Sequence, residues 1–160
     1  MTNTYIDTSV LVESILGKNK AKSEDMRTLS RIQSTGQKVM MPQLVIGETY
    51  FQIYDDEIST SNEVHLNVKK FTELIQSLVP ITHGCTPAFS KEILELSLEI
   101  REKDSNLDYC DSLIVSHVLL DLDSRYLYTM DTSIQESTFI QQKLTQRKND
   151  GNEVKVKDIR

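Results

Sequence analysis

The fold is decided by a short stretch near the start of the chain, residues 4–10, which reads TYIDTSV. A β-prone run ends there on a carboxylate, Asp7, and two hydroxyl residues lead from it into an apolar helical pattern. The stretch therefore places an acid where a strand becomes a helix, which is where open α/β sheets build their binding sites. Residues that act together with Asp7 must reach the same carboxyl edge of the sheet.

The length and composition are those of one ordinary globular domain, which we expect to span residues 1–160. Of the 160 residues 38% are hydrophobic, and only 5 are Gly and 3 are Pro, so collagen-like and low-complexity classes are excluded. No apolar run approaches the roughly 18 to 20 residues that span a bilayer, and the first residues lack the basic and apolar regions of a signal peptide. The sequence therefore predicts a cytoplasmic protein with no membrane partner.

The charge balance limits the classes of partner. A formal net charge of -6 and a pI near 5.1 argue against a protein that coats DNA non-specifically, because phosphate binding needs Lys and Arg. A divalent cation held by several acids would reverse the sign of the local field, so nucleic acid is not excluded. The cysteines, Cys85 and Cys110, and the three histidines show no metal-ligand spacing, and we interpret the cysteines as reduced, partly buried thiols.

Predicted strands and helices alternate along the chain. Strands are expected at residues 4–7, 38–41, 79–81, 125–129 and 154–156. Helices are expected at residues 10–16, 22–33, 43–58, 62–78, 86–103, 107–122 and 139–146. No two strands are joined by a tight hairpin turn, which favours an α/β fold with a mostly parallel sheet of four to five strands and helices on both faces.

Four acids are distinguished by their positions: Asp7, Glu48, Asp111 and Asp131. Asp7 ends the first strand and Asp131 follows the fourth. If these two strands are neighbours in a parallel sheet, both carboxylates reach the crevice at its switch point.

The other two acids lie on predicted helices. Glu48 shares a helical stripe with Leu44 and Phe51, where an apolar side chain is expected. Asp111 stands near the start of the most apolar helix of the chain, one turn after Asp108. Carboxylates buried at such positions must be paired, protonated or bound to a metal.

Each acid also has a purely structural interpretation. Asp7 and Asp131 precede hydroxyl residues and could each cap a helix, Asp108 and Asp111 could serve a helix dipole, and Glu48 could pair with a nearby lysine. Four acids at one edge without basic neighbours would repel one another, however, and a hard divalent cation is the simplest remedy.

Such a site favours a particular chemistry. Mg²⁺ or Mn²⁺ takes oxygen ligands and commonly holds a phosphate group beside one or two carboxylates. A water on the metal can then attack a phosphodiester, so no nucleophilic side chain is needed. The chain contains no GxSxG, P-loop, GxGxxG or HExxH motif, which agrees with hydrolysis of this kind.

Four stretches, in chain order, resemble the motifs of PIN-domain nucleases and in particular of VapC-like toxins. They are YIDTSVL at 5–11, MPQLVIGE at 41–48, DSLIV at 111–115 and YTMD at 128–131. The resemblance covers residues 4–135. It implies a three-layer α/β/α fold, a Mg²⁺- or Mn²⁺-dependent endoribonuclease with RNA as substrate, an antitoxin partner for toxin members, and homodimers.

The resemblance also implies roles for individual residues. Carried over position by position, the metal-binding acids are Asp7, Glu48, Asp111 and Asp131, with Asp108 as an additional acid. Ser9 and Thr129 match hydroxyl positions that orient the first and last of these acids. The chain departs from the pattern at Thr132 and Ser133, where many members carry a further acid, and this departure disfavours a second metal.

Two other functions fit the sequence. The first is a binding module that has lost its chemistry and acts through the helical hairpin at 43–78. The second is a phosphatase with an aspartate at a strand end, which would need a second Asp two residues after Asp7, where this chain has Ser9. The candidate cations for an RNA surface are Lys18, Lys20, Lys22, Arg27, Arg31 and Lys38.

Overall fold

The sheet is parallel and has four strands in the part of the chain that the structure describes. The structure is a computed structural model, and it describes residues 2–17, 37–56, 59–78 and 90–158. The strands are β1 (Asn3–Ile6), β2 (Lys38–Met40), β3 (Ser124–Thr129) and β4 (Lys155–Asp158), in the order β2-β1-β3-β4. All three neighbouring pairs are parallel. The predicted parallel sheet is confirmed, whereas the expected strand at 79–81 and helix at 22–33 lie outside the described residues.

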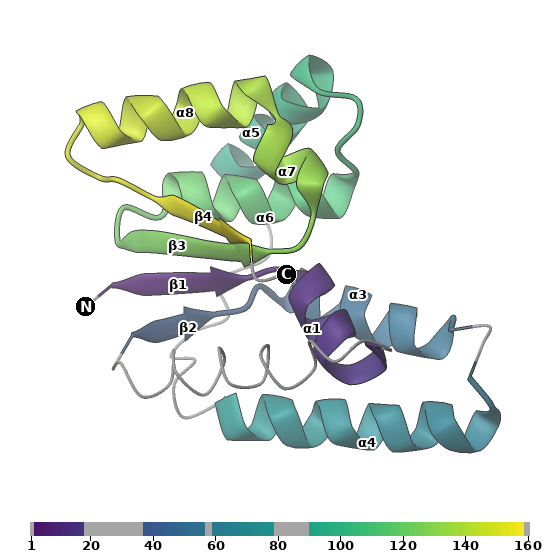
Figure 1. Cartoon of the computed structure of the whole chain (residues 1–160). Coiled ribbons are helices and arrows are strands. Elements are labelled where there is room, and N and C mark those ends of the chain that lie inside the picture. Colours follow the sequence, from purple (N-terminus) through teal and green to yellow (C-terminus); the bar gives the residue numbers. More distant parts are fainter. Residues whose placement is uncertain (1, 18–36, 57–58, 79–89, 159–160) are drawn as a thin grey trace.

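Helices cover both faces of this sheet. They are α1 (Thr8–Leu16), α3 (Gln43–Tyr54), α4 (Ser61–Leu78), α5 (Lys91–Lys103), α6 (Tyr109–Leu120), α7 (Thr132–Glu136) and α8 (Thr138–Asn149). In Figure 1, α5 to α8 gather on one side of the strands and α1, α3 and α4 on the other. This is the expected three-layer α/β/α arrangement. None of the described helices is long and apolar enough to cross a membrane.

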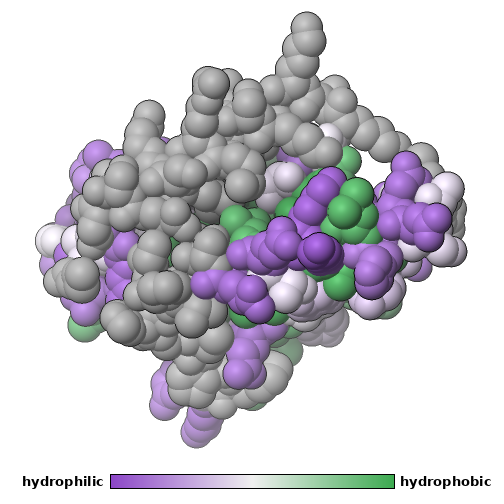
Figure 2. Space-filling view, turned by 90° about the horizontal axis from the view of Figure 1, so that it is seen from below, coloured by the Kyte–Doolittle hydropathy of each residue, from purple (hydrophilic) through white to green (hydrophobic). Residues whose placement is uncertain are grey.

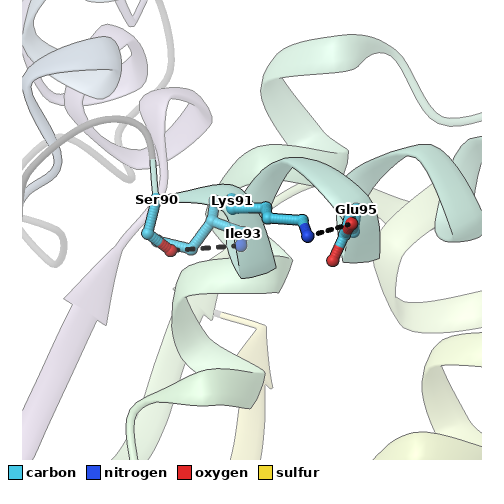
Figure 3. Close-up of polar contacts among 4 residues, drawn as sticks. All are labelled: Ser90, Lys91, Ile93 and Glu95. Atoms are coloured by element: carbon cyan, nitrogen blue, oxygen red, sulfur yellow. Dashed lines mark hydrogen bonds and ion pairs between the residues drawn. The ribbon is translucent and has the colours of Figure 1, made fainter.

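Local side-chain chemistry sets where the helices begin and end. Ser90 accepts a hydrogen bond from the backbone N–H of Ile93 and so starts α5 at Lys91. Figure 3 shows this cap beside the exposed ion pair of Lys91 and Glu95, whose charged atoms are 3.6 Å apart. Such an exposed pair contributes only about 0.3 to 0.5 kcal/mol, so the cap rather than the ion pair fixes the start of α5.

Two helices are shorter than their periodicity predicted. α3 ends at Tyr54 rather than at 58, and α6 runs from Tyr109 to Leu120 rather than over 107–122. α6 is buried nearly all round, as its composition predicted. α7 was not predicted, because five residues are too few to show a helical period.

The core packs the helices on both faces against the strands of the sheet. Tyr5, Ile6 and Leu127 of the two interior strands are at most 1% exposed. On the side of α4, the ring of Phe71 packs edge-on against that of Tyr50, with centroids 4.8 Å apart, and the Tyr50 hydroxyl lies 3.0 Å from Thr72 Oγ1. These contacts fix α4 against α3 and hold the hairpin in place beside α1.

A polar network ties the amino end of β1 to α6. The Tyr5 hydroxyl donates to Asp121 Oδ2 (2.9 Å), and Asn3 Nδ2 donates to the same oxygen (2.7 Å). Asp121 is the C-cap residue of α6. The Tyr5 side chain therefore points to the α6 side of the sheet, and burial with the Asp121 charge raises the pKa of its hydroxyl.

Candidate active site

Asp7 lies at the carboxyl end of β1 and is only 4% exposed. Its N–H donates to the carbonyl of Tyr128 (2.9 Å), which continues the pairing of β1 with β3. Asp7 occupies the N-cap position of α1 but makes no side-chain capping hydrogen bond. Its Oδ2 instead accepts from Ser9 Oγ (2.6 Å) and Thr129 Oγ1 (2.8 Å). The carboxylate is thus held by hydroxyls from two elements.

The same two hydroxyls fix the end of β3. Ser9 Oγ accepts from the N–H of Met130 (3.0 Å), and Thr129 Oγ1 accepts from the N–H of Asp131 (2.9 Å). Thr129 is fully buried. The adjacent carboxyl ends of β1 and β3 therefore share one small hydrogen-bond network, as the neighbourhood of the first and fourth predicted strands required.

Glu48 reaches the site from α3. Its Oε2 accepts a 2.6 Å hydrogen bond from Thr8 Oγ1, and its Oε1 lies 3.4 Å from Gln52 Nε2. The Cys110 side chain is a further hydrogen-bond partner of Glu48. The described partners of Glu48 are thus a hydroxyl, an amide and a thiol, and not the lysine that the structural alternative proposed. Thr8 is 4% exposed and Glu48 is half-buried, so the contact is partly shielded from water.

The row of residues on α3 that contains Glu48 does not face the core. Phe51, on that stripe, is 66% exposed, and the buried residues of α3 are Val45, Thr49 and Ile53. The stripe prediction is wrong because α3 packs through the adjacent row of side chains. Glu48 lies half-buried at the margin of the packed face.

Asp108 and Asp111 form a reciprocal capping box at the start of α6. The Asp108 side chain accepts from the N–H of Asp111 (2.8 Å), and the Asp111 side chain accepts from the N–H of Asp108 (3.2 Å). Asp131 likewise caps α7 by accepting from the N–H of Ser133 (2.7 Å). For these three acids the structural interpretation is correct locally, and it places their carboxylates at helix N-termini, where negative charge is favoured.

The acids influence one another electrostatically. Burial raises the pKa of Asp111 to about 7, with Asp108 as the next cause and smaller contributions from Asp131 and Asp7. Burial also raises the pKa of Glu48, and the charges of Asp108 and Asp7 add to this effect. All five predicted acids therefore lie within electrostatic range at one edge of the sheet.

These acids do not converge into a finished ligand set. Within the described ranges, no three Asp, Glu, His or Cys side chains are placed so that they could hold a metal ion. The prediction that these acids form a cluster able to hold a metal is therefore corrected: each carboxylate is turned toward its own hydroxyl or N–H donor. The donor set consists of carboxylate oxygens, which are the ligands that Mg²⁺ and Mn²⁺ prefer, so the residues fit such an ion chemically.

Sequence reasoning missed two residues beside Glu48. Thr8 gave no signal beyond its place between Asp7 and Ser9. Cys110 lies half-buried on α6, and burial, followed by the Glu48 charge, raises the pKa of its thiol to about 12. The thiol is therefore protonated, as expected for a reduced cysteine. Of the candidate RNA-contacting cations only Lys38 falls within the described residues.

Comparison with known proteins places this geometry in a family. The model of the PIN domain family matches residues 4–138. The fold is similar to that in the crystal structure of FitAcB from Neisseria gonorrhoeae, at 14% identity and a TM-score of 0.62, with 98% of this chain and 97% of that chain covered. It is similar to the crystal structure of VapBC2 from Rickettsia felis bound to a DNA fragment from their promoter, at 14% identity and a TM-score of 0.63, with 98% of each chain covered. A search of curated protein sequences found no significant match. Because the family model spans most of the chain, this protein belongs to the PIN domain family.

Proposed function

We propose that this protein is a Mg²⁺- or Mn²⁺-dependent endoribonuclease whose metal-binding acids are Asp7, Glu48, Asp111 and Asp131, with Asp108 beside them. The observation that supports the proposal is that these acids, from the ends of β1 and β3 and from α3 and α6, lie within electrostatic range of one another at the carboxyl edge of the sheet. In the described residues their carboxylates do not yet form a ligand set. Membership of the PIN domain family supports a nuclease.

The chain's own residues position the acids. Ser9 and Thr129 orient Asp7 through two hydroxyl hydrogen bonds, and Thr8 orients Glu48. When bound, a divalent cation supplies neutralisation of the charge on the scissile phosphate and lowers the pKa of a water molecule. The acids at this edge would hold that cation, and its positive charge would offset their mutual repulsion.

An RNA cleavage assay with Asp7→Asn tests this function. The variant keeps the size of the side chain and can still accept a hydrogen bond, but it removes the charge. We expect cleavage of single-stranded RNA in Mn²⁺ to fall to the level seen in EDTA. Asp150→Asn, an exposed acid at the C-cap of α8, is the matched control and should cleave as the parent does. If Asp7→Asn cuts RNA at the parental rate, the assignment fails.

We further infer that the protein is the toxin of a toxin–antitoxin pair and that its antitoxin binds the hairpin of α3 and α4. The two solved relatives named above, FitAcB and VapBC2, are toxin–antitoxin proteins, and VapBC2 is bound to a DNA fragment from their promoter. Phe51 and Tyr54 on α3 are each 66% exposed, and Leu66 on α4 is 50% exposed. Figure 2, which views the molecule from the side of α4, shows apolar residues among hydrophilic ones on the described part of this face.

A cavity of about 480 Å³ adds to this hairpin surface. Its lining residues are Tyr54, Asp56, Ser59, Ser61, Val64 and His65. Co-expression with the product of a neighbouring gene for a small DNA-binding protein tests the inference. Phe51→Ser with Tyr54→Ser should abolish co-purification, whereas Leu122→Ser, at a residue 67% exposed after α6, should not. Equal recovery of the partner with both variants would show that it binds elsewhere.

A homodimer is also proposed, through α5. Leu94 and Leu98 lie one turn apart on this helix and are 41% and 54% exposed, so they form an apolar pair open to water. Sedimentation of the parent should give a dimer, and Leu94→Lys with Leu98→Lys should give a monomer. A parental monomer at high protein concentration would contradict the proposal.

A further inference from the structure

Two tyrosines and two lysines share one face of the sheet at β3 and β4. Tyr126 is opposite Lys155 and Tyr128 is opposite Lys157 in the register of the two strands. Alternate residues of a strand point to the same face, and residues in register on neighbouring strands do so as well. We call these four residues the tyrosine–lysine stripe.

The stripe faces away from α6. Leu127, between the two tyrosines, is 1% exposed and lies opposite Tyr5, whose hydroxyl reaches the C-cap of α6. The stripe is therefore on the other face, and Figure 1 shows α6 behind β4. Both lysines are exposed and both tyrosines are partly exposed, although Tyr128 also packs against the hydrophobic core. Parts of all four side chains are therefore accessible to solvent.

The side chains of the stripe are arranged as an aromatic surface with one lysine over it. The rings of Tyr126 and Tyr128 have centroids 6.2 Å apart and are tilted by 31°. The Nζ of Lys157 lies 5.5 Å from the centroid of the Tyr126 ring. Unpaired bases stack on aromatic rings of this kind, while neighbouring lysines contact the phosphates.

A cavity of about 330 Å³ opens at the amino end of the stripe. It is lined by Thr2, Gln37, Arg125, Tyr126, Gly151, Glu153 and Lys155. The Arg125 guanidinium is fixed by hydrogen bonds to the carbonyls of Leu122 (2.9 Å) and Ser124 (2.8 Å). Glu153 brings a negative charge, but its carboxylate pairs with Lys148 at 3.0 Å. The cavity thus combines an aromatic wall with cations.

The opposite end of the stripe meets the candidate active site. Tyr128 precedes Thr129, whose hydroxyl donates to Asp7, so the stripe runs from the cavity at the amino edge to the acids at the carboxyl edge. A polyanion entering an acidic site in a chain of net charge -6 needs cations close by to offset the repulsion. Lys155 and Lys157 supply such charges on the same face.

We propose that the tyrosine–lysine stripe and its cavity bind a single-stranded segment of the RNA substrate outside the cleavage site. Bases stack on Tyr126 and Tyr128, Lys155 and Lys157 contact phosphates, and one nucleotide enters the cavity beside Arg125. The inference rests on the proposed nuclease function, because the RNA held here is the one cut at the acids. Stacking on a sheet requires unpaired bases, so single strands are bound in preference to duplexes.

Edge protection is the competing explanation for the lysines. β4 is the edge strand, and lysines on such a strand prevent it from pairing with other chains. That role needs neither the tyrosines nor the cavity. The two explanations therefore differ in what happens when Tyr126 is changed.

Fluorescence anisotropy with a labelled, short single-stranded oligoribonucleotide in EDTA tests the stripe without cleavage. Tyr126→Leu should weaken binding about tenfold, the usual loss of one base–aromatic stack. Lys155→Gln with Lys157→Gln should lower the slope of log Kd against log salt by about 1.4, which is about 0.7 for each phosphate contact. Lys69→Gln with Lys70→Gln, exposed on α4, makes the same charge change and should alter neither quantity.

Three results would overturn the proposal: no RNA binding by the parent in EDTA, parental affinity in Tyr126→Leu, or equal competition by duplex DNA of the same sequence. Melting temperatures of all variants exclude unfolding as the cause of a loss. Cleavage in Mn²⁺ is scored separately. A parent that binds RNA through the stripe but never cuts it would refute the nuclease function and not the binding site, whereas cleavage with an unchanged KM in Tyr126→Leu would refute only the stripe.

Discussion

Thr8 Oγ1 donates a 2.6 Å hydrogen bond to Glu48 Oε2, and this contact joins α1 to α3 directly beside Asp7. Thr8 is 4% exposed, and its hydroxyl donor is therefore directed at one acceptor in a shielded position. A hydroxyl that donates to a carboxylate in this way sets the direction in which the carboxylate points.

Replacing Thr8 by Val should leave the Glu48 carboxylate without its hydroxyl partner, while all the acids of the site are kept. Partners that orient ligands in this way typically contribute about 10- to 100-fold in metal affinity or activity, and we expect a loss of this size in RNA cleavage and in Mn²⁺ affinity by calorimetry. Thr8→Ser keeps the hydroxyl and should stay near the parent. Parental activity in Thr8→Val would show that Glu48 needs no such support.

Thr129→Val should lower the stability of the protein. The Thr129 hydroxyl donates to Asp7 and accepts from the N–H of Asp131, and it is fully buried. Leaving those two groups without their partner should cost about 1 to 3 kcal/mol in the free energy of unfolding. Urea denaturation measures the loss, and Thr129→Ser should recover most of it. An unchanged midpoint would mean that water replaces the hydroxyl.

The network of Asp121 can be tested with a double-mutant cycle. Asp121→Ala leaves the buried Tyr5 hydroxyl without its acceptor, and this should cost about 1 to 3 kcal/mol of stability. Tyr5→Phe removes the hydroxyl as well, so the double variant should be more stable than the sum of the two single losses predicts. Strict additivity in denaturation experiments would show that the contact carries no coupling energy.

Residues close in sequence were predicted well, because strand ends, caps and turns depend on local chemistry. The positions of Asp7 and Asp131 at strand ends followed from the local pattern, whereas the adjacency of their strands was only a condition, which the strand order now meets. The orientation of Glu48 did not, because its partner is forty positions away in Thr8 and the stripe with Phe51 faces solvent. Asp121 gave no signal for the same reason: its partners Asn3 and Tyr5 come from the other end of the chain.

Stability should depend on pH through His117. This residue of α6 is 2% exposed, and burial lowers its pKa from the ordinary value of 6.5, although the charge of Asp121 opposes the effect. The folded state therefore binds a proton less readily than the unfolded state. The stability that comes from keeping His117 neutral is fully present above about pH 6.5. It is lost as the pH falls from there through the lowered pKa of His117.

Melting temperatures measured between about pH 8 and pH 5 check this dependence. His117→Gln should flatten the decline on the acid side, whereas His65→Gln, at an exposed position on α4, should leave it as in the parent. A parental melting temperature that stays constant over this range would contradict the role of His117.

Asp111 should cost stability in the absence of a divalent cation and contribute it in the presence of one. Burial and the charge of Asp108 disfavour its ionised form, as the pKa of about 7 shows. Asp111→Asn should therefore melt at a higher temperature than the parent in EDTA at a pH above this value, since the amide can still accept from the N–H of Asp108.

Added Mn²⁺ should raise the melting temperature of the parent, because an ion bound only by the folded state stabilises it. The variant should gain little, and Asp150→Asn should respond as the parent does. If Asp111→Asn is destabilised in EDTA and gains as much as the parent from Mn²⁺, Asp111 serves the capping box alone and the metal-binding acids must be sought elsewhere.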